Sequence, residues 1–286
     1  MQILKTKSFS CSFFAFVFVL LTLWQIIVAE KMYQLVWADE FDEQNLNMTY
    51  WEYDTGCSGW GNNELECYTA NRRENVRLEN GKLIVQARVE SFSDHSFTSG
   101  RIKTNIAWTY GRFEAKVKLP AGFQLWPAVW MLPLNDLYGM WAASGEIDIL
   151  EARGNDPQIF LGTIHYGGSW PNHIHSGSGE QRVSNIDFSK DFHVFAIEWT
   201  PEMIRWFVDG TIYHTENINR NMWSGQGRNP YQKNGQPFDQ PFHFVVNLAI
   251  GGNFFGPGPY VTPERALKEW TQPTLELEYL RVYQLK

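Results

Sequence analysis

The sequence predicts an all-β fold, either a sandwich or a jelly roll, on the basis of three observations. Segments in which apolar and polar residues alternate recur along the chain, and this period is typical of strands with one face against a core. Gly, Pro and Asn separate these segments at regular spacing, and helix signals are scarce. About 257 of the 286 residues follow an N-terminal apolar segment, a length that suits one large all-β domain.

The clearest strand signals lie in the segments 83–89 and 111–119. In each segment every second residue is apolar and points to one face: Leu83, Val85, Ala87 and Val89 in the first, Phe113, Ala115, Val117 and Leu119 in the second. Further strands are predicted over 192–199, 203–208, 211–214, 242–250 and 275–283. Asp209-Gly210 is typical of a two-residue hairpin turn. The best helix signal is Thr262-Pro263-Glu264, an N-cap followed by Pro, which leads into a short turn through Trp270.

Residues 1–29 have the pattern of a signal peptide. Lys5 and Lys7 form a short basic region, the run from Phe13 to Val28 is almost wholly apolar, and Ala29 suits cleavage before Glu30. A retained N-terminal anchor is the alternative, because the apolar run is near the lower limit for a membrane span. We expect cleavage, and therefore a secreted chain of one domain over residues 30–286 without stable membrane association.

The charge of the chain argues against anionic ligands. The net charge of −7 becomes −9 when residues 1–29 are removed, since these hold two lysines and no acid. Nucleic acid and anionic polysaccharides both need a basic groove, so we expect neither as a partner. The 13 Trp, 12 Tyr and 20 Phe residues exceed what one core usually needs, which leaves aromatic side chains for a binding surface.

Two cysteines remain after cleavage, Cys57 and Cys67, because Cys11 lies in the N-terminal segment. In an oxidising compartment, two cysteines that flank a Gly/Asn-rich turn are expected to form a disulfide. Two free buried thiols are the alternative. Asn47-Met-Thr49 is a glycosylation acceptor in a host that glycosylates.

Three carboxylates stand close together in the stretch Gly145-Glu-Ile-Asp-Ile-Leu-Glu151. On a regular strand Glu146 and Asp148 share one face, whereas Glu151 would point into the core, which is costly for a charge. One extra residue near Ile149-Leu150, a β-bulge, returns Glu151 to the acidic face. Two glutamates leaning together can then reach the ~5–5.5 Å separation that glycosidic cleavage with a carboxylate nucleophile requires. A solvated acidic face and a Ca²⁺ site of oxygen ligands are the alternatives.

Trp126 and Trp130 lie on one face of a predicted strand, with the small Ala128 between them. Val129 and Met131 take the opposite face and supply the core. Flat indole rings at this spacing suit the flat faces of sugar rings, so we expect both tryptophans in a substrate cleft. Core packing is the alternative for either one.

The acidic stretch resembles the signature of glycoside hydrolase family 16 in its bulged form, Glu-x-Asp-x-x-Glu. This form is typical of the laminarinase branch, the endo-β-1,3-glucanases, rather than the lichenase branch. Other motifs of the family follow in the right order: Trp37-Ala-Asp-Glu-Phe-Asp42, Trp60-Gly-Asn-Asn-Glu64, Ser99-Gly-Arg101, Leu125-Trp-Pro-Ala-Val-Trp-Met-Leu-Pro133, Asn247-Leu-Ala-Ile-Gly-Gly252 and Tyr279-Leu-Arg-Val-Tyr283. The resemblance implies a concanavalin A-like β-jelly roll of two antiparallel sheets with a concave substrate cleft. It also implies hydrolysis with retention, without a cofactor for catalysis.

The resemblance gives each acid a role. Glu146 is implied as the nucleophile, Asp148 as the residue that orients it, and Glu151 as the acid/base. The general acid must hold its proton near neutral pH, which requires desolvation or neighbouring negative charge, and both are expected here.

Four further residues match substrate-binding positions of the family. Arg101 resembles a sugar-contacting arginine, and Asn63 resembles a substrate-hydroxyl binder, with Asn62 as the alternative. Trp141 resembles a cleft tryptophan near the cleavage point, and His165 is implied near the acid/base, on the leaving-group side. Their structural alternatives are an edge-strand charge for Arg101, loop packing for Trp141 and a structural histidine for His165.

The family also implies a structural Ca²⁺ on the convex face, remote from the chemistry. The matching ligands are Glu40, the Gly81 carbonyl and Glu278. Glu278 stands where the family usually has Asp, and its added methylene changes the reach of the carboxylate.

The sequence therefore predicts a secreted, monomeric enzyme that cleaves β-1,3-glucan polysaccharides. A β-glucan recognition protein on the same fold is the first alternative, although such relatives typically lose the catalytic acids that stand here. The same chemistry on mixed-linkage β-1,3-1,4-glucan or on a marine galactan is the second. A sulfated galactan would want more cleft arginine than this acidic chain offers.

Overall fold

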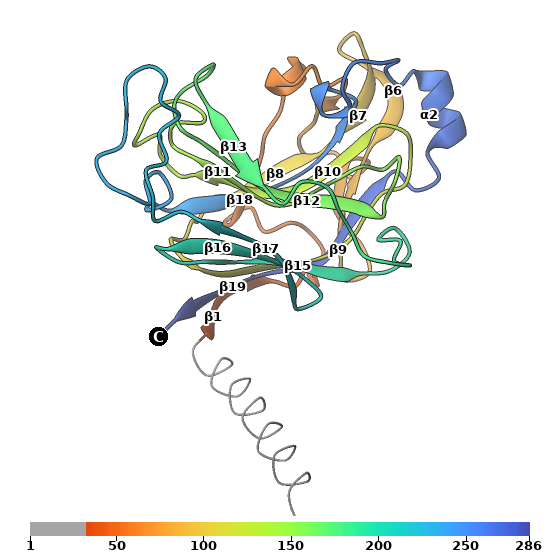
Figure 1. Cartoon of the computed structure of the whole chain (residues 1–286). Helices are drawn as coiled ribbons and strands as arrows, with labels where there is room; N and C mark the ends of the chain where they lie inside the picture. Colours follow the sequence, from red (N-terminus) through yellow and green to blue (C-terminus); the bar gives the residue numbers. More distant parts are fainter. Residues whose placement is uncertain (1–32) are drawn as a thin grey trace, which may run out of the picture.

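The computed structural model describes residues 33–286, which form two large sheets stacked face to face (Figure 1). The predicted signal peptide over residues 1–29 lies outside the described residues. Within the described part, no helix has both the length and the apolar character needed to cross a membrane.

The first large sheet is antiparallel and holds most of the strands that the sequence predicts. Its order is β17 (Thr211–Asn217), β16 (Met203–Val208), β15 (His193–Trp199), β9 (Gly111–Lys118), β19 (Thr274–Leu285), β5 (Leu83–Gln86) and β4 (Val76–Leu78), with β1 (Tyr33–Asp39) also paired to β19. The predicted alternation on β9 is confirmed, since Phe113, Ala115 and Val117 are fully buried while the polar residues between them are partly exposed.

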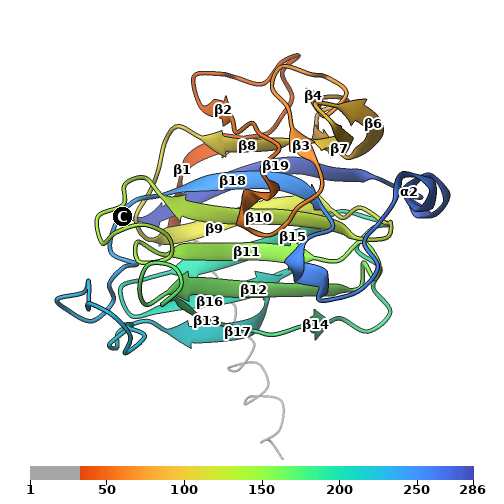
Figure 2. The ribbon, with the colours of Figure 1, turned by 90° about the horizontal axis from the view of Figure 1, so that it is seen from above.

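The second large sheet is also antiparallel and carries the acidic stretch near its middle. Its order is β13 (Ile174–Gly177), β12 (Ile159–Tyr166), β11 (Glu146–Ala152), β10 (Leu125–Pro133), β18 (Phe242–Ile250), β8 (Arg101–Thr104) and β2 (Trp51–Tyr53), with β14 (Gln181–Arg182) paired to β12. Figure 2 looks down on this sheet, with β10, β11 and β18 crossing its centre.

A small third sheet stands above one end of the second and was not predicted. It consists of β3 (Cys67–Tyr68), β7 (His95–Ser99) and β6 (Arg88–Phe92), and Figure 1 shows β6 and β7 near helix α2 (Pro263–Glu269). The predicted strand 83–89 is therefore divided, because the chain leaves the first sheet after Gln86 and enters the third at Arg88. Two 3₁₀ turns, η1 (Gly59–Gly61) and η2 (Asn253–Phe255), lie in loops.

Local turn and cap signals are confirmed where the sequence places them. Asp209 and Gly210 both have positive φ, 47° and 77°, as a two-residue hairpin turn between β16 and β17 requires. Helix α2 begins after Thr262, whose hydroxyl accepts a hydrogen bond from the Arg265 backbone N–H at 3.3 Å.

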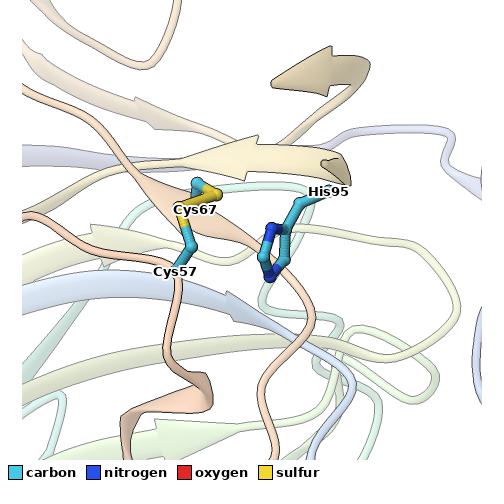
Figure 3. Close-up of side chains that lie close together, drawn as sticks. All are labelled: Cys57, Cys67 and His95. Atoms are coloured by element: carbon cyan, nitrogen blue, oxygen red, sulfur yellow. A yellow bond between two sulfur atoms is a disulfide. The ribbon is translucent and has the colours of Figure 1, made fainter. Parts of the chain in front are cut away.

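The predicted disulfide between Cys57 and Cys67 is present (Figure 3). It closes the loop that contains η1 and anchors this loop to β3. His95 lies beside the two sulfur atoms, but the sulfurs are bonded to each other and are not available as thiolate ligands.

Candidate active site

The bulge predicted in the acidic strand is confirmed by the pairing of β11 with both neighbours. Asp148 pairs with Thr163 of β12 and Glu151 pairs with Leu161, so three steps on β11 match two steps on β12. The register against β10 shifts at the same point. The extra residue lets Ile149 and Leu150, both fully buried, point into the core in succession, and Glu151 returns to the acidic face.

The backbone at the bulge receives a hydrogen bond from the opposite sheet. The Trp206 indole on β16 donates to the Asp148 carbonyl oxygen at 2.8 Å, which satisfies an acceptor next to the interrupted ladder. Gly162 of β12 makes room for this ring, because a Cβ atom there would lie 2.2 Å from Trp206 Cδ1. The bulge, Gly162 and Trp206 thus form one fitted unit.

Each outer glutamate accepts a hydrogen bond from one tryptophan indole. Trp141 donates to Glu146 Oε2 at 2.7 Å, and Trp126 donates to Glu151 Oε1 at 3.0 Å. His165 lies across the strand pair from Glu146, with its Nε2 atom 3.7 Å from Glu146 Oε1 and 3.4 Å from Asp148 Oδ2. The three acids therefore face one side of the sheet and are held by donors from separate elements.

Burial and mutual repulsion favour the protonated forms of the two glutamates. Desolvation and the charge of Asp148 raise the pKa of Glu146 to about 7 and that of Glu151 to about 8. The nearby His165 charge opposes both shifts. The higher pKa at Glu151 suits a proton donor, and the lower pKa at Glu146 suits a group that ionises first.

His165 is positively charged at neutral pH in this arrangement. Burial alone lowers its pKa, but the contact with Asp148 and the charges of Glu146 and Asp148 outweigh burial and raise the pKa to about 9. His165 thus lies beside Glu146 and Asp148, and its expected position on the leaving-group side stays a prediction.

The acidic cluster does not fit the Ca²⁺ alternative. Glu146, Asp148 and His165 each offer one ligand atom within 4.8 Å of the others, but one of these atoms is a nitrogen. Ca²⁺ takes six to eight oxygen ligands, and the protonated imidazole already supplies the positive charge of the cluster.

Trp126 and Trp130 lie on the outer face of β10, as predicted, and each is half-buried. Trp126 stacks on Phe254 of η2 with ring centroids 4.4 Å apart and planes 5° apart. Trp130 donates from its indole to Asn247 Oδ1 at 2.7 Å. The sequence reasoning missed Phe254 as the partner of Trp126, although the pair of phenylalanines beside the Gly-Gly turn was a signal for it.

Arg101 is buried beside Trp130 and has its own carboxylate partner. Its guanidinium lies between the rings of Trp60 and Trp130, 4.5 Å and 4.8 Å from their centroids, and its Nε atom lies 3.1 Å from Asp54 Oδ2. Its charge reaches Glu146, whose pKa it lowers. Arg101 is thus not an edge-strand surface charge but a buried cation on the face of the second sheet that carries Trp130 and the acids. Its partner Asp54 was not predicted.

Asn63 is exposed in the loop after η1, and its backbone has a positive φ of 56°. Its side chain donates to Asn253 Oδ1 at 2.9 Å, whereas Asn62 turns inward and donates to Glu64. Of the two candidates, Asn63 is therefore the one placed to meet a ligand.

Aromatic rings continue outward from Trp141 on the β12–β13 side of the sheet. The ring centroids of Trp141 and His173 lie 4.7 Å apart, and those of His173 and Trp170 lie 5.1 Å apart. Trp170 is 69% exposed. Backbone hydrogen bonding from Trp170 N to Trp141 O at 2.9 Å joins the two loops. His173 and Trp170 were missed because their position depends on this contact between loops.

The residues proposed for the structural Ca²⁺ do not fit a cation site. Both oxygens of Glu40 pair with Arg281 at 2.8 Å, and Glu278 pairs with Lys116 at 2.6 Å. Gly81 lies in the turn between β4 and β5. Because both carboxylates are already neutralised by cations, the expected ligand set is not available as it stands.

The comparisons with known proteins agree with this geometry. Residues 62–249 match the family model of glycosyl hydrolases family 16. The chain belongs to this family. It is 46% identical over 258 residues to a glucan endo-1,3-beta-glucosidase of Cryptopygus antarcticus, which covers 88% of this chain and 93% of that protein. The predicted jelly-roll glycosidase fold is confirmed.

Two further relatives show the range of the family. The X-ray structure of the laminarinase from Rhodothermus marinus superposes with a TM-score of 0.76 at 41% identity, over 89% of this chain and 98% of that chain. A beta-1,3-glucan-binding protein of Penaeus monodon is 33% identical over 304 residues, covering 86% of this chain and 81% of that protein. Family membership therefore includes relatives named for hydrolysis and one named for binding.

Proposed function

We propose that this protein is a secreted endo-β-1,3-glucanase that hydrolyses laminarin-type glucans with retention of anomeric configuration. The observation that carries the proposal is the bulged strand β11, which presents Glu146 and Glu151 on one face with raised pKa values. The names of the similar glucosidase and laminarinase supply the substrate class.

In the first step Glu146 attacks the anomeric carbon while Glu151 gives its proton to the leaving oxygen. The Trp141 N–H and the His165 charge favour the ionised form of Glu146 that this attack needs. In the second step Glu151, now ionised, takes a proton from the incoming water, and water releases the sugar from Glu146. Asp148 lies between the two glutamates along the strand, contacts His165 and keeps the imidazolium in place.

Binding without hydrolysis is the competing function, because one similar protein is named for β-1,3-glucan binding. The complete acid set and its indole donors favour catalysis, since pure binding gains nothing from buried, repelling carboxylates. Mixed-linkage β-1,3-1,4-glucan is a side substrate under the same proposal.

The proposal that the chain is secreted rests on the signal-like residues 1–29 and on the Cys57–Cys67 bond, which forms in oxidising compartments.

Reducing-sugar release from laminarin, lichenan, curdlan and agarose tests the activity. We expect laminarin to be hydrolysed fastest, with the β-anomer formed first when the products are followed by NMR. Glu146→Ala and Glu151→Ala should each abolish hydrolysis, by at least about 10³-fold, while the circular dichroism spectrum stays native. Wild-type-like activity in either variant, or initial release of the α-anomer, would refute the assignment.

A further inference from the structure

A pair of buried carboxyl groups, Glu64 and Glu66, lies behind the cleft floor and takes no part in the mechanism above. Glu66 is fully buried; its Oε2 atom accepts the Ile250 backbone N–H at 2.7 Å. Its Oε1 atom is also buried and meets no donor among the described residues. Glu64 is 7% exposed and accepts two hydrogen bonds, from the Tyr68 hydroxyl at 2.9 Å and from Asn62 Nδ2 at 3.2 Å.

The two carboxyls differ in the donors that surround them. Glu64 has two donors of its own, while Glu66 has only a backbone donor on one oxygen. Burial and the Glu64 charge raise the pKa of Glu66 well above its usual range. A neutral Glu66 carries no charge that the unpartnered Oε1 would leave unstabilised, and its O–H becomes a donor for which the neighbouring Glu64 is the acceptor.

Few other charged groups face the pair. Tyr68 of β3 contacts Glu64, and Arg101 of β8 acts on Tyr68 from the cleft side. From β18 the pair meets the Ile250 N–H, which does not titrate. The described surroundings therefore offer Glu66 no cation within hydrogen-bond distance, so its proton is the means of neutralisation.

Hydrogen bonds connect the pair to one cleft tryptophan. Tyr68 donates to Glu64 and accepts from Asn247 Nδ2 at 3.0 Å. Asn247 in turn accepts the Trp130 indole N–H at 2.7 Å. The orientation of the Trp130 ring is thus fixed by a chain that ends at the two acids.

A second connection runs through the loops to the other cleft tryptophan. The segment that carries Glu64 bonds to the turn after β18, with Asn253 N donating to Asn62 O at 2.7 Å. Phe254 follows in that turn and stacks on Trp126, the donor to Glu151. The acid pair therefore lies where both cleft tryptophans are anchored.

We propose that Glu64 and Glu66 are positioning residues that share one proton and hold Trp130 and the Trp60–Asn63 loop in the geometry that binds the glucan. The kinetic part rests on the proposed function; the stability part does not. Loss of the proton would leave two buried negative charges and loosen this side of the cleft.

The sign of the pH effect follows from the direction of the shift. The folded-state pKa of Glu66 lies above its unfolded value, so its contribution to stability is complete below the unfolded pKa. The contribution is lost as pH rises through the folded pKa. Glutamine at this position keeps a donor toward Glu64 at every pH and an acceptor for the Ile250 N–H.

The test compares the wild type with Glu66→Gln, Glu66→Leu and Tyr68→Phe, with Glu43→Gln at an exposed position as the matched control. We expect the Tm of Glu66→Gln to rise relative to the wild type as pH increases from 5 to 9, by several degrees. The Glu43→Gln curve should run parallel to the wild type. Parallel curves for Glu66→Gln would overturn the shared proton, whether or not laminarin is a substrate.

The positioning role is tested by measuring KM and kcat of each variant on laminarin at pH 6. Tyr68→Phe and Glu66→Leu should raise KM about tenfold with kcat changed less than about threefold, and Glu66→Gln should keep both near wild type. An unchanged KM in both Tyr68→Phe and Glu66→Leu would contradict positioning. If the wild type does not hydrolyse laminarin, the proposed function is wrong. The Tm comparison between Glu66→Gln and the wild type then still shows whether Glu66 holds a proton.

Discussion

Single side chains in this cleft serve binding and proton control at once. Trp141 and Trp126 present ring surface to the cleft, and their indole N–H groups donate to Glu146 and Glu151. Each donor favours the ionised carboxylate, whereas burial favours the protonated one. The balance leaves the pKa values of both glutamates near neutral pH. At that pH the nucleophile has to be ionised while the proton donor keeps its proton.

His165→Asn tests the charge in this balance. Removing the imidazolium should raise the pKa of both glutamates, because its charge lowers each of them. Glu146 must be ionised and Glu151 protonated, so the acidic and alkaline limbs of kcat/KM against pH should both move to higher pH. The value at the optimum should fall by roughly tenfold or more, because Asp148 and Glu146 lose the imidazolium that lies 3.4 Å and 3.7 Å from them.

The control for that profile is His193→Asn in the first sheet, where His193 pairs with Asp209 at 2.7 Å. It should leave both limbs in place. If His165→Asn also leaves them in place, the imidazolium does not set the pKa of the catalytic acids.

At the scale of elements, patterns local in sequence could be predicted and contacts between distant loops could not. The parity of Glu151 required a bulge, and the bulge is present because Ile149 and Leu150 both need the core. The stacking of Phe254 on Trp126 joins segments more than a hundred residues apart, so no local period reports it. The ion pair that occupies Glu40, one of the expected calcium ligands, could not be predicted for the same reason. Arg281 lies far from Glu40 in sequence and contacts it only because β1 pairs with β19.

Gly162→Ala tests whether the bulge depends on the Trp206 ring beneath it. The new Cβ would lie 2.2 Å from Trp206 Cδ1, so the indole must move and release the Asp148 carbonyl. Overpacking of this kind costs about 1–3 kcal/mol, and we expect a Tm lower by roughly 5 °C with kcat reduced at least tenfold. Gly258→Ala is the control, because a Cβ atom there would meet nothing within 4 Å, and it should change neither Tm nor kcat. If Gly162→Ala keeps the Tm and kcat of the wild type, the bulge does not depend on Trp206.

Over the whole molecule, the second sheet presents a continuous row of functional side chains across its strands. The row runs from His165 on β12 through the acids of β11, Trp130 on β10 and Asn247 on β18 to Arg101 on β8. The fold class and the part of the row on β10 and β11 could be predicted from alternation along the strands and one bulge, whereas Arg101 was expected only from the family resemblance. The third sheet and the outer aromatic wall could not, because both are built from loops.

Trp170→Ala tests how far the cleft extends beyond the acids. The ring is 69% exposed, so its removal should leave Tm unchanged. If a glucan chain covers about 40 Å² of it, the loss is about 1 kcal/mol, or roughly a fivefold higher KM on laminarin at unchanged kcat. Short oligosaccharides that end at Trp141 should show no change. The matched control is Leu267→Ala, because the Leu267 side chain lies on α2 and is 76% exposed. If the Trp170→Ala variant and this control have the same KM, the glucan-binding surface ends at Trp141.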